Sequence, residues 1–194
     1  MCCLFLAASS TVAIAQTNVV DLVNPIIGTN GMGHTFPGAC VPFGLVQLSP
    51  DTDTIPHNVD GKYQPRSYEY CAGYQHKDSS IVGFSHTHFS GTGHSDLGDI
   101  LIMPTTGTLK LNPGTATNPD GGYRSRFSHD TEISRPGYYE VMLADYGVKA
   151  QLTTTQRAGI HKYTYPTNSE NQRIILDMIH GIYNYDGKVL WTNI

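Results

Sequence analysis

Residues 138–155 have the sequence YYEVMLADYGVKAQLTTT, in which apolar and polar side chains alternate on both sides of a short turn. Successive side chains of a β-strand point to opposite faces, so this alternation predicts two half-buried strands. The turn at residues 145–147 ends in glycine, which favours an antiparallel hairpin. The buried faces of the two strands are expected to consist of Tyr139, Val141 and Leu143, and of Val148, Ala150, Leu152 and Thr154.

The segments around this hairpin also have strand-like patterns. Residues 158–165 predict a further strand that stops at Pro166, because proline cannot donate to a strand ladder. Residues 173–179 are more continuously apolar, which predicts a strand deep in the core. Residues 97–111 predict two strands joined by a turn at residues 104–107.

The composition suits a turn-rich β protein. Glycine, proline and tyrosine account for 20, 11 and 12 of the 194 residues, and only 14% of the residues are charged. No amphipathic run of twelve or more residues survives the glycine and proline breaks, so helices are not expected. We predict an all-β fold, an antiparallel β-sandwich formed by residues 16–194 as one domain with long Gly/His-rich loops. The net charge of −4 and the lack of a basic run argue against nucleic acid as a partner.

The two ends of the sequence suggest a fragment of an exported protein. Residues 1–15 are uncharged and end in Ala-Ile-Ala, a pattern typical of a signal peptide cleaved before Gln16. No basic residue precedes the apolar run, so we expect the signal peptide to begin upstream; a buried first strand is the alternative. The run is too short to cross a bilayer. At the other end, residues 188–194 resemble the middle of a strand, so the domain is expected to be truncated at its C-terminus.

Residues 28–95 differ from the strand-rich C-terminal half. Four of the nine histidines lie in two glycine-rich segments, GHTFPG at residues 33–38 and GFSHTHFSGTGHSDLGD at residues 83–99. Long loops in a compact domain are usually functional or rest against another surface. These two segments are therefore the first candidates for a site.

His86 and His88 are two residues apart and would project from the same side of an extended segment. With Asp96 or Asp99 they resemble a His/His/carboxylate zinc set. The alternative, which we favour, is that these histidines hydrogen-bond a polar ligand or the loop backbone. The two aspartates are candidate acids of a glycoside hydrolase by residue type only, and at a strand entry they are expected to cap turns.

Two further patterns favour a structural role over metal binding or nucleophilic catalysis. Asp51 and Asp53 could bind calcium, but the remaining oxygen ligands of an EF-hand are missing, so solvated turn residues are the better interpretation. Ser85 and Ser90 lie near histidines in the sequence, yet neither occurs in the Gly-x-Ser-x-Gly elbow of serine hydrolases.

Aromatic and cysteine residues leave alternatives open. A tyrosine cluster suits stacking on sugar rings or simple packing around a loop; it comprises Tyr63, Tyr68, Tyr70 and Tyr74. Cys40 and Cys71 would be the only cysteines left after leader removal. They either form one disulfide in an oxidising compartment or remain buried thiols.

Several strings, in order along the chain, resemble the blocks of glycoside hydrolase family 92. They are VNPIIGT (23–29), GHTFPGA (33–39), PFGLVQLSPDT (42–52), the segment 83–104, PGYYEV (136–141) and LTTTQRAGIHKYTYP (152–166). The resemblance covers nearly all of the chain after residue 16. It implies a secreted, exo-acting α-mannosidase that removes terminal mannose from glycans with inversion and with the help of calcium. Such a protein would be periplasmic or at the cell surface of a Gram-negative bacterium.

In this family an N-terminal sandwich packs on a barrel of paired helices, and the active site lies between them. The resemblance implies that the catalytic acid, the base and the calcium ligands belong to the barrel, which residues 16–194 do not contain. It therefore implies no catalytic residue and no metal ligand in this chain, and an isolated chain without hydrolase activity.

The Gly/His-rich loops would form one wall of the mannose pocket. By motif match, the expected substrate contacts are His34, Phe36, Gly38, Cys40, His86, His88, Gly93, His94 and Asp96. Among them, His94 is the position expected to influence linkage preference. Two other classes remain open: a stand-alone carbohydrate-binding sandwich, and a zinc-dependent hydrolase built on His86 and His88.

Overall fold

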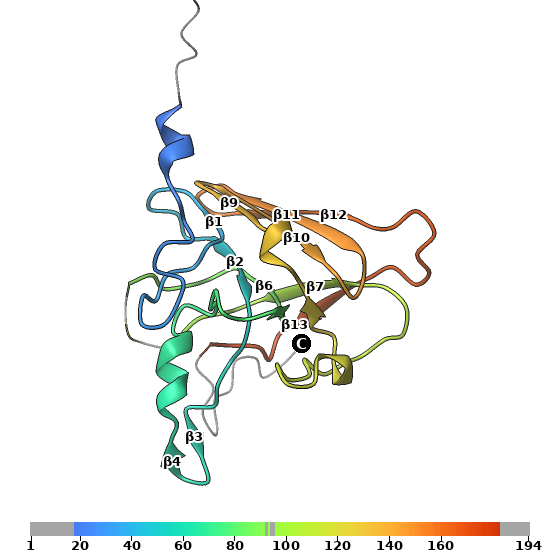
Figure 1. Cartoon of the computed structure of the whole chain (residues 1–194), viewed down its shortest axis with the longest axis horizontal. Helices are drawn as coiled ribbons and strands as arrows, with labels where there is room; N and C mark the ends of the chain where they lie inside the picture. The colour runs from blue at the N-terminus through green and yellow to red at the C-terminus, as the bar shows by residue number, and fades with distance from the viewer. Residues whose placement is uncertain (1–17, 92, 94–95, 183–194) are drawn as a thin grey trace, which may run out of the picture.

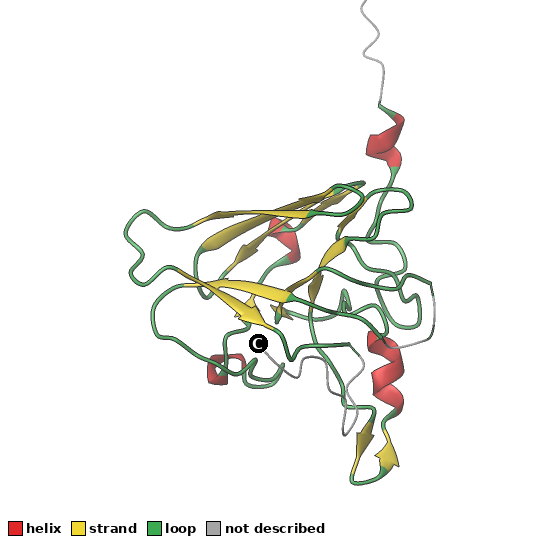
Figure 2. Cartoon of the chain, turned by 180° about the vertical axis from the view of Figure 1, so that it is seen from behind, coloured by secondary structure: helices red, strands yellow, loops and turns green. Residues whose placement is uncertain are grey.

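The computed structural model describes residues 18–91, 93 and 96–182, which form two packed antiparallel sheets and two small two-stranded sheets (Figures 1 and 2). The five-stranded sheet has the order β1 (Ala39–Cys40), β2 (Gln47–Asp51), β6 (Gly83–Ser85), β7 (Leu101–Thr105), β13 (Arg173–Asp177). The four-stranded sheet has the order β12 (Gly159–Thr164), β11 (Val148–Thr154), β10 (Tyr138–Leu143), β9 (Ile133–Arg135). One two-stranded sheet is the hairpin of β3 (Asn58–Val59) and β4 (Lys62–Tyr63). The other pairs two strands that are distant in sequence, β5 (Ser80–Ile81) and β8 (Ser125–Arg126).

Helical structure in the described residues is limited to short 3₁₀ turns. These are η1 (Val19–Leu22), η2 (Pro65–Tyr70), η3 (Pro119–Gly121) and η4 (His129–Thr131). No helix in this part of the chain has the length and hydrophobicity that crossing a bilayer requires. The predicted all-β sandwich is therefore confirmed, whereas residues 1–15 and 188–194, with the predictions made for them, lie outside the described residues.

The hairpin predicted from residues 138–155 is present as β10 and β11. Leu143 pairs with Val148, and the side chains alternate between buried and partly exposed along both strands. Gly147 closes the turn with a φ of +62°, a left-handed conformation that glycine adopts without steric cost. β12 follows as predicted from residues 158–165.

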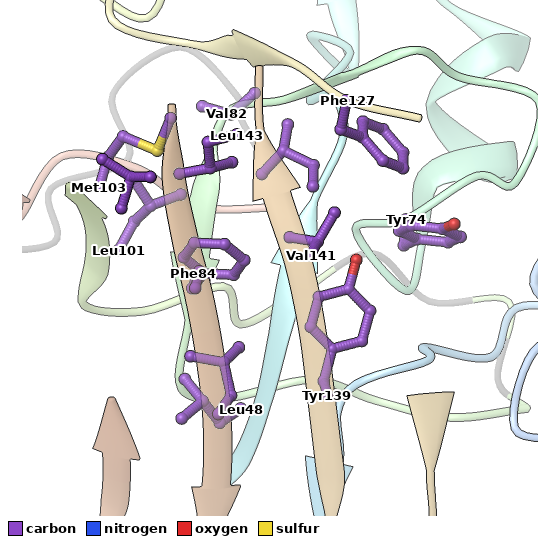
Figure 3. Close-up of a cluster of buried hydrophobic side chains, with 14 of the residues drawn as sticks. Leu48, Tyr74, Val82, Phe84, Leu101, Met103, Phe127, Tyr139, Val141 and Leu143 are labelled. Carbon is purple, nitrogen blue, oxygen red and sulfur yellow. The ribbon is translucent and has the colours of Figure 1, made fainter. Parts of the chain in front are cut away.

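The core lies between the two sheets (Figure 3). Phe84 of β6 contacts Tyr139 of β10 and Tyr163 of β12, with ring centroids 6.5 Å apart in both pairs. Leu48 and Leu101 are also fully buried on the five-stranded sheet. Each fully buried side chain of this kind contributes about 1.5–3 kcal/mol through the hydrophobic effect.

The prediction that residues 173–179 form a deeply buried strand was wrong. β13 is an edge strand that pairs only with β7, and its side chains alternate between the core and the surface. Ile175 packs against the core, but Ile174 and Leu176 are 61% and 55% exposed. A continuous apolar run does not reveal whether both faces of a strand are covered.

The prediction of two strands within residues 97–111 was also wrong. Only β7 forms. It pairs with β6 before it and with β13 about 70 residues later, and not with the segment that directly follows it. Leu109 and Leu111 lie in a loop and are 49% and 80% exposed. A long-range partner therefore replaced the local hairpin that the turn pattern suggested.

Candidate functional site

The pairing of β2 with β6 buries a polar cluster beneath the Gly/His-rich loops. Asp51 is completely buried, and its two carboxylate oxygens lie 2.8 Å from His88 Nε2 and 2.7 Å from His180 Nε2. The Ser85 hydroxyl donates to the same carboxylate at 2.7 Å. We call Asp51, Ser85, His88 and His180 the Asp51 cluster.

The electrostatics of this cluster favour the ionised carboxylate. Burial by itself opposes ionisation of Asp51, but the charge of His88 and hydrogen bonds from His180 and His88 outweigh it. The pKa of Asp51 therefore lies well below its ordinary value. Gly73 makes room for this carboxylate, since a Cβ there would lie 2.0 Å from Asp51 Oδ1. The interpretation of Asp51 as a solvated turn residue is corrected: a turn motif in sequence does not show that the next strand covers it.

The Asp51 cluster contains serine, histidine and aspartate but does not form a catalytic triad. Asp51 and Ser85 both contact His88 at Nε2, whereas Nδ1 of that ring donates to the Gln47 carbonyl at 2.7 Å. In a triad the aspartate and the serine contact opposite ring nitrogens. The serine is also fully buried, so the cluster holds the start of the 86–99 loop instead of presenting a nucleophile.

His86 and His88 turn to different partners, which favours the hydrogen-bonding interpretation over a zinc set with Asp96 or Asp99. His86 donates from Nδ1 to the Ile100 carbonyl at 2.8 Å, and its Nε2 lies 3.1 Å from His161 Nε2 on β12. His88 turns into the Asp51 cluster. Because β6 ends at Ser85, the strict alternation behind the prediction does not hold beyond that residue.

The His86–His161 pair links the loop to the four-stranded sheet. Burial lowers the pKa of His86, and burial together with the neighbouring His86 lowers the pKa of His161 to about 4. His161 Nδ1 lies 2.6 Å from the Tyr163 hydroxyl. Neutral rings at pH 7 can share one hydrogen between the two facing nitrogens.

His34 brings the two Gly/His-rich segments together. Its ring contacts Tyr68 edge-on with centroids 4.7 Å apart, and its carbonyl accepts a hydrogen bond from Gly91 N at 2.6 Å. Gly93 lies against the same tyrosine, because a Cβ on it would be 2.0 Å from the Tyr68 hydroxyl. His34 is buried with a φ of +52°, and its Nε2 has no hydrogen-bond partner in the described structure. Buried polar atoms without a partner are rare in proteins, so this nitrogen marks the position for attention.

The other predicted substrate contacts of the first segment differ in what they contact and in how exposed they are. The Phe36 ring lies 5.2 Å from the ring of His88, tilted by 35°. Gly38 packs so closely on β2 that a Cβ would lie 2.2 Å from the Leu48 carbonyl oxygen. Cys40 is exposed on β1 and Cys71 is buried after η2, and no disulfide joins them.

The aspartates of the second segment stabilise its backbone, as the alternative interpretation expected. Asp96 accepts a hydrogen bond from Leu97 N at 2.8 Å, and Asp99 accepts one from the Thr87 hydroxyl at 3.0 Å. His94 lies outside the described residues, so its predicted role is not tested.

The tyrosine cluster divides into two pairs. Tyr70 and Tyr74 are buried, and their hydroxyls donate to the carboxylates of Asp78 and Glu132. Tyr63 and Tyr68 are 51% and 41% exposed, so only these two present aromatic surface to a ligand.

Sequence reasoning missed two residues that support the loops. His180 joins the Asp51 cluster from 129 residues away, and nothing in its neighbourhood marks it as a partner. Gln75 is 1% exposed, accepts a hydrogen bond from Gly31 N at 2.8 Å and donates to the Gly31 carbonyl at 3.0 Å. An uncharged amide between Tyr74 and His76 gives no sequence signal for such a role.

A cavity away from these loops also lies within the described residues. It has a volume of about 530 Å³ and is lined by Leu111, Tyr123 and residues 175–181. None of the predicted substrate contacts lines it.

The fold and loops define a class of protein: an antiparallel β-sandwich in which glycine- and histidine-rich loops gather over a buried polar cluster. Residues 22–194 match the model of the glycosyl hydrolase family 92 N-terminal domain. The chain belongs to this family.

Solved structures and a curated relative agree with this assignment. The family GH92 α-mannosidase BT3965 from Bacteroides thetaiotaomicron, in complex with mannoimidazole, has a TM-score of 0.77 and 48% identity, over 85% of this chain and 20% of that one. The GH92 inverting mannosidase BT2199 from the same organism has a TM-score of 0.64 and 27% identity, over 85% of this chain and 20% of its own. An uncharacterized secreted glycosidase of Arthroderma benhamiae is 29% identical over 170 residues, 83% of this chain and 19% of that protein. This chain therefore spans about a fifth of the length of these relatives.

Proposed function

We propose that this chain is the N-terminal part of a secreted α-mannosidase that removes terminal α-linked mannose from glycans with inversion. Its Gly/His-rich loops form one wall of the mannose pocket, and a C-terminal barrel domain supplies the other wall. Membership of family 92 and 48% identity to an α-mannosidase support the reaction class. The buried, unpartnered Nε2 of His34 is the observation that supports this location of the pocket wall.

The described residues are suited to binding and orienting a sugar. If a ligand displaces the atoms that cover it, His34 Nε2 can exchange one hydrogen bond with a ligand hydroxyl, and the half-exposed Tyr68 beside it offers an aromatic edge. Gly91 and Gly93 carry no side chain, so a ligand can approach the loop backbone closely. His94 lies in the same loop, and we propose that it influences linkage preference.

We propose that the acid–base pair for inversion lies outside the described residues. That reaction needs one protonated carboxylic acid and a second carboxylate about 6.5–9.5 Å away, with a water between them. Asp51 is buried and held ionised, and Asp96 and Asp99 accept hydrogen bonds from the loop. We therefore propose that the isolated 194-residue chain lacks hydrolase activity.

Calcium, which the family implies, does not fit the side chains described here. The one group of three metal-ligating side chains in the described part of the chain contains two histidines, whereas calcium takes six to eight oxygen ligands. No step of the reaction is therefore assigned to calcium in this chain.

The test uses the intact gene product, obtained by extending the reading frame past Ile194. We expect calcium-dependent mannose release, and a fall in kcat/KM of about tenfold for His34→Ala, the equivalent of losing one hydrogen bond to the sugar. The matched control is His57→Ala, at a histidine near the β3–β4 hairpin, which should leave kcat/KM unchanged.

Two results would contradict the proposal. An intact product that binds mannose without hydrolysing it would favour a carbohydrate-binding module that uses Tyr63 and Tyr68. Mannose release by the isolated chain, abolished by His86→Ala, would show that the catalytic groups lie within these 194 residues.

A further inference from the structure

A second group of ligating side chains lies away from the Gly/His-rich loops. His76 follows η2 in a loop, His129 begins η4, and Glu132 ends it. One ligand atom from each of these three residues lies within 4.8 Å of the other two. We propose that His76, His129 and Glu132 bind one divalent transition-metal ion, with zinc as the best-suited metal.

The carboxylate of Glu132 is the centre of this group. Its side chain is only 3% exposed, and its one ion pair among the described residues is with His129 Nδ1 at 2.7 Å. Hydroxyls of Tyr74 and Tyr139 donate to it at 2.9 Å and 2.7 Å. Tyrosines orient a carboxylate without neutralising it, so a cation here would balance a buried negative charge.

The ligand types select the class of metal. Two imidazole nitrogens and one carboxylate oxygen form a mixed set that zinc and its neighbours prefer, and that calcium or magnesium does not. The rings of His76 and His129 already lie with centroids 4.0 Å apart. A tetrahedral zinc with bonds of about 2.1 Å separates its ligand atoms by roughly 3.4 Å. The ligand atoms here lie within 4.8 Å of one another, and the 2.7 Å contact between His129 and Glu132 would have to lengthen to admit the ion. His129 is exposed, which leaves the fourth position open to water.

The surroundings suggest what the metal would do. The backbone N–H of His76 donates to the Thr29 carbonyl at 2.9 Å, and the preceding residue, Gln75, holds Gly31. η4 leads directly into β9 of the four-stranded sheet. An ion bound by His76, His129 and Glu132 would therefore link two segments. One is the loop of Gln75 and His76, which supports residues 28–33, and the other is the segment that leads into the four-stranded sheet. This is a structural clamp, separate from the proposed mannose wall.

The histidine pair His86–His161 is the main competitor for an added metal. Its two Nε2 atoms are 3.1 Å apart, but the described residues add no third ligand to them. Three ligands hold zinc more tightly than two, so the group with Glu132 should fill first.

The experiment titrates purified, metal-stripped protein with Zn²⁺ by isothermal calorimetry and with Co²⁺ by visible absorption, which reports tetrahedral coordination. We expect one tight zinc site and at least tenfold weaker binding by His129→Gln, at an exposed position that leaves the fold intact by circular dichroism. The matched variants His57→Gln and His161→Gln should bind as the unchanged protein does. Saturating zinc should also raise the thermal midpoint of the parent protein but not that of His129→Gln.

Three results would overturn the assignment: no zinc binding tighter than millimolar, unchanged binding in His129→Gln, or binding lost in His161→Gln alone. As a second variant, Glu132→Gln keeps the shape of the side chain while removing its charge and replacing one acceptor oxygen with an NH2 donor. It should weaken zinc binding to a similar degree; binding equal to that of the parent would contradict the role of the carboxylate.

Discussion

The two sheets of this sandwich are built in different ways. In the four-stranded sheet, β9 to β12 follow one another along the chain, and each pairs with its sequence neighbour. In the five-stranded sheet, β6 pairs with β2 and β7 pairs with β13, across much longer separations. The first sheet supplies a regular apolar face. The second supplies the Asp51 cluster and carries the Gly/His-rich loops, so the candidate site depends on contacts between distant segments.

The largest expected effect comes from breaking the long-range sheet at its polar centre. Asp51→Ala leaves His88 and His180 without the carboxylate that both contact, deep in the protein. We expect a loss of about 3–5 kcal/mol in the free energy of unfolding, as for other buried pairs that lose one partner. Urea denaturation measures it; a loss below about 1 kcal/mol would show that the cluster is not the centre of this sheet.

The matched change in the locally paired sheet is Leu152→Ala on β11. Leu152 is 1% exposed and lies in the apolar core, so the cavity left behind should lower stability by about 2–4 kcal/mol. The same denaturation experiment applies. Sugar binding by the intact product distinguishes the two sheets further. We expect the Asp51→Ala variant to lose binding and the Leu152→Ala variant to retain it. Loss of binding in both variants would show that the loops do not depend specifically on the long-range sheet.

The contact between the two sheets through His86 and His161 should respond to pH. The pKa of His161 is about 4 in the folded state, below the 6.5 expected when unfolded, so the unfolded state binds more protons between these values. Stability should therefore fall as the pH decreases from 6.5 to 4, by on the order of 2 kcal/mol after allowance for partial exposure. His161→Gln should flatten this part of the stability curve, and His57→Gln should not. An unchanged slope in His161→Gln would place the acid sensitivity elsewhere.

The smallest effect is expected on the outer face of β13. Ile174 is 61% exposed, so Ile174→Thr should change the free energy of unfolding by no more than about 0.5 kcal/mol. Thermal or urea unfolding of this chain provides the measurement. A loss comparable to that of Leu152→Ala would show that another part of the protein covers this face.

The accuracy of the sequence-based predictions follows the same division between the sheets. The hairpin of β10 and β11, and the strand β12 after it, were predicted nearly to the residue because the turn and the alternation that define them are local. The burial of β13 and the second strand of residues 97–111 were predicted incorrectly. Both depended on which distant segment would pair with β7, and local patterns carry no information about that choice.

For the site, the residue types in the chain were enough to select the Gly/His-rich loops and the family, because those strings are long and unusual. The partners of each side chain required the tertiary structure. Only the folded chain brings His180 to Asp51, turns His86 toward His161 and His88 away from it, and leaves one buried nitrogen of His34 without a partner. Spacing along a sequence constrains direction only within a regular strand, whereas loop side chains are oriented by contacts with distant parts of the chain.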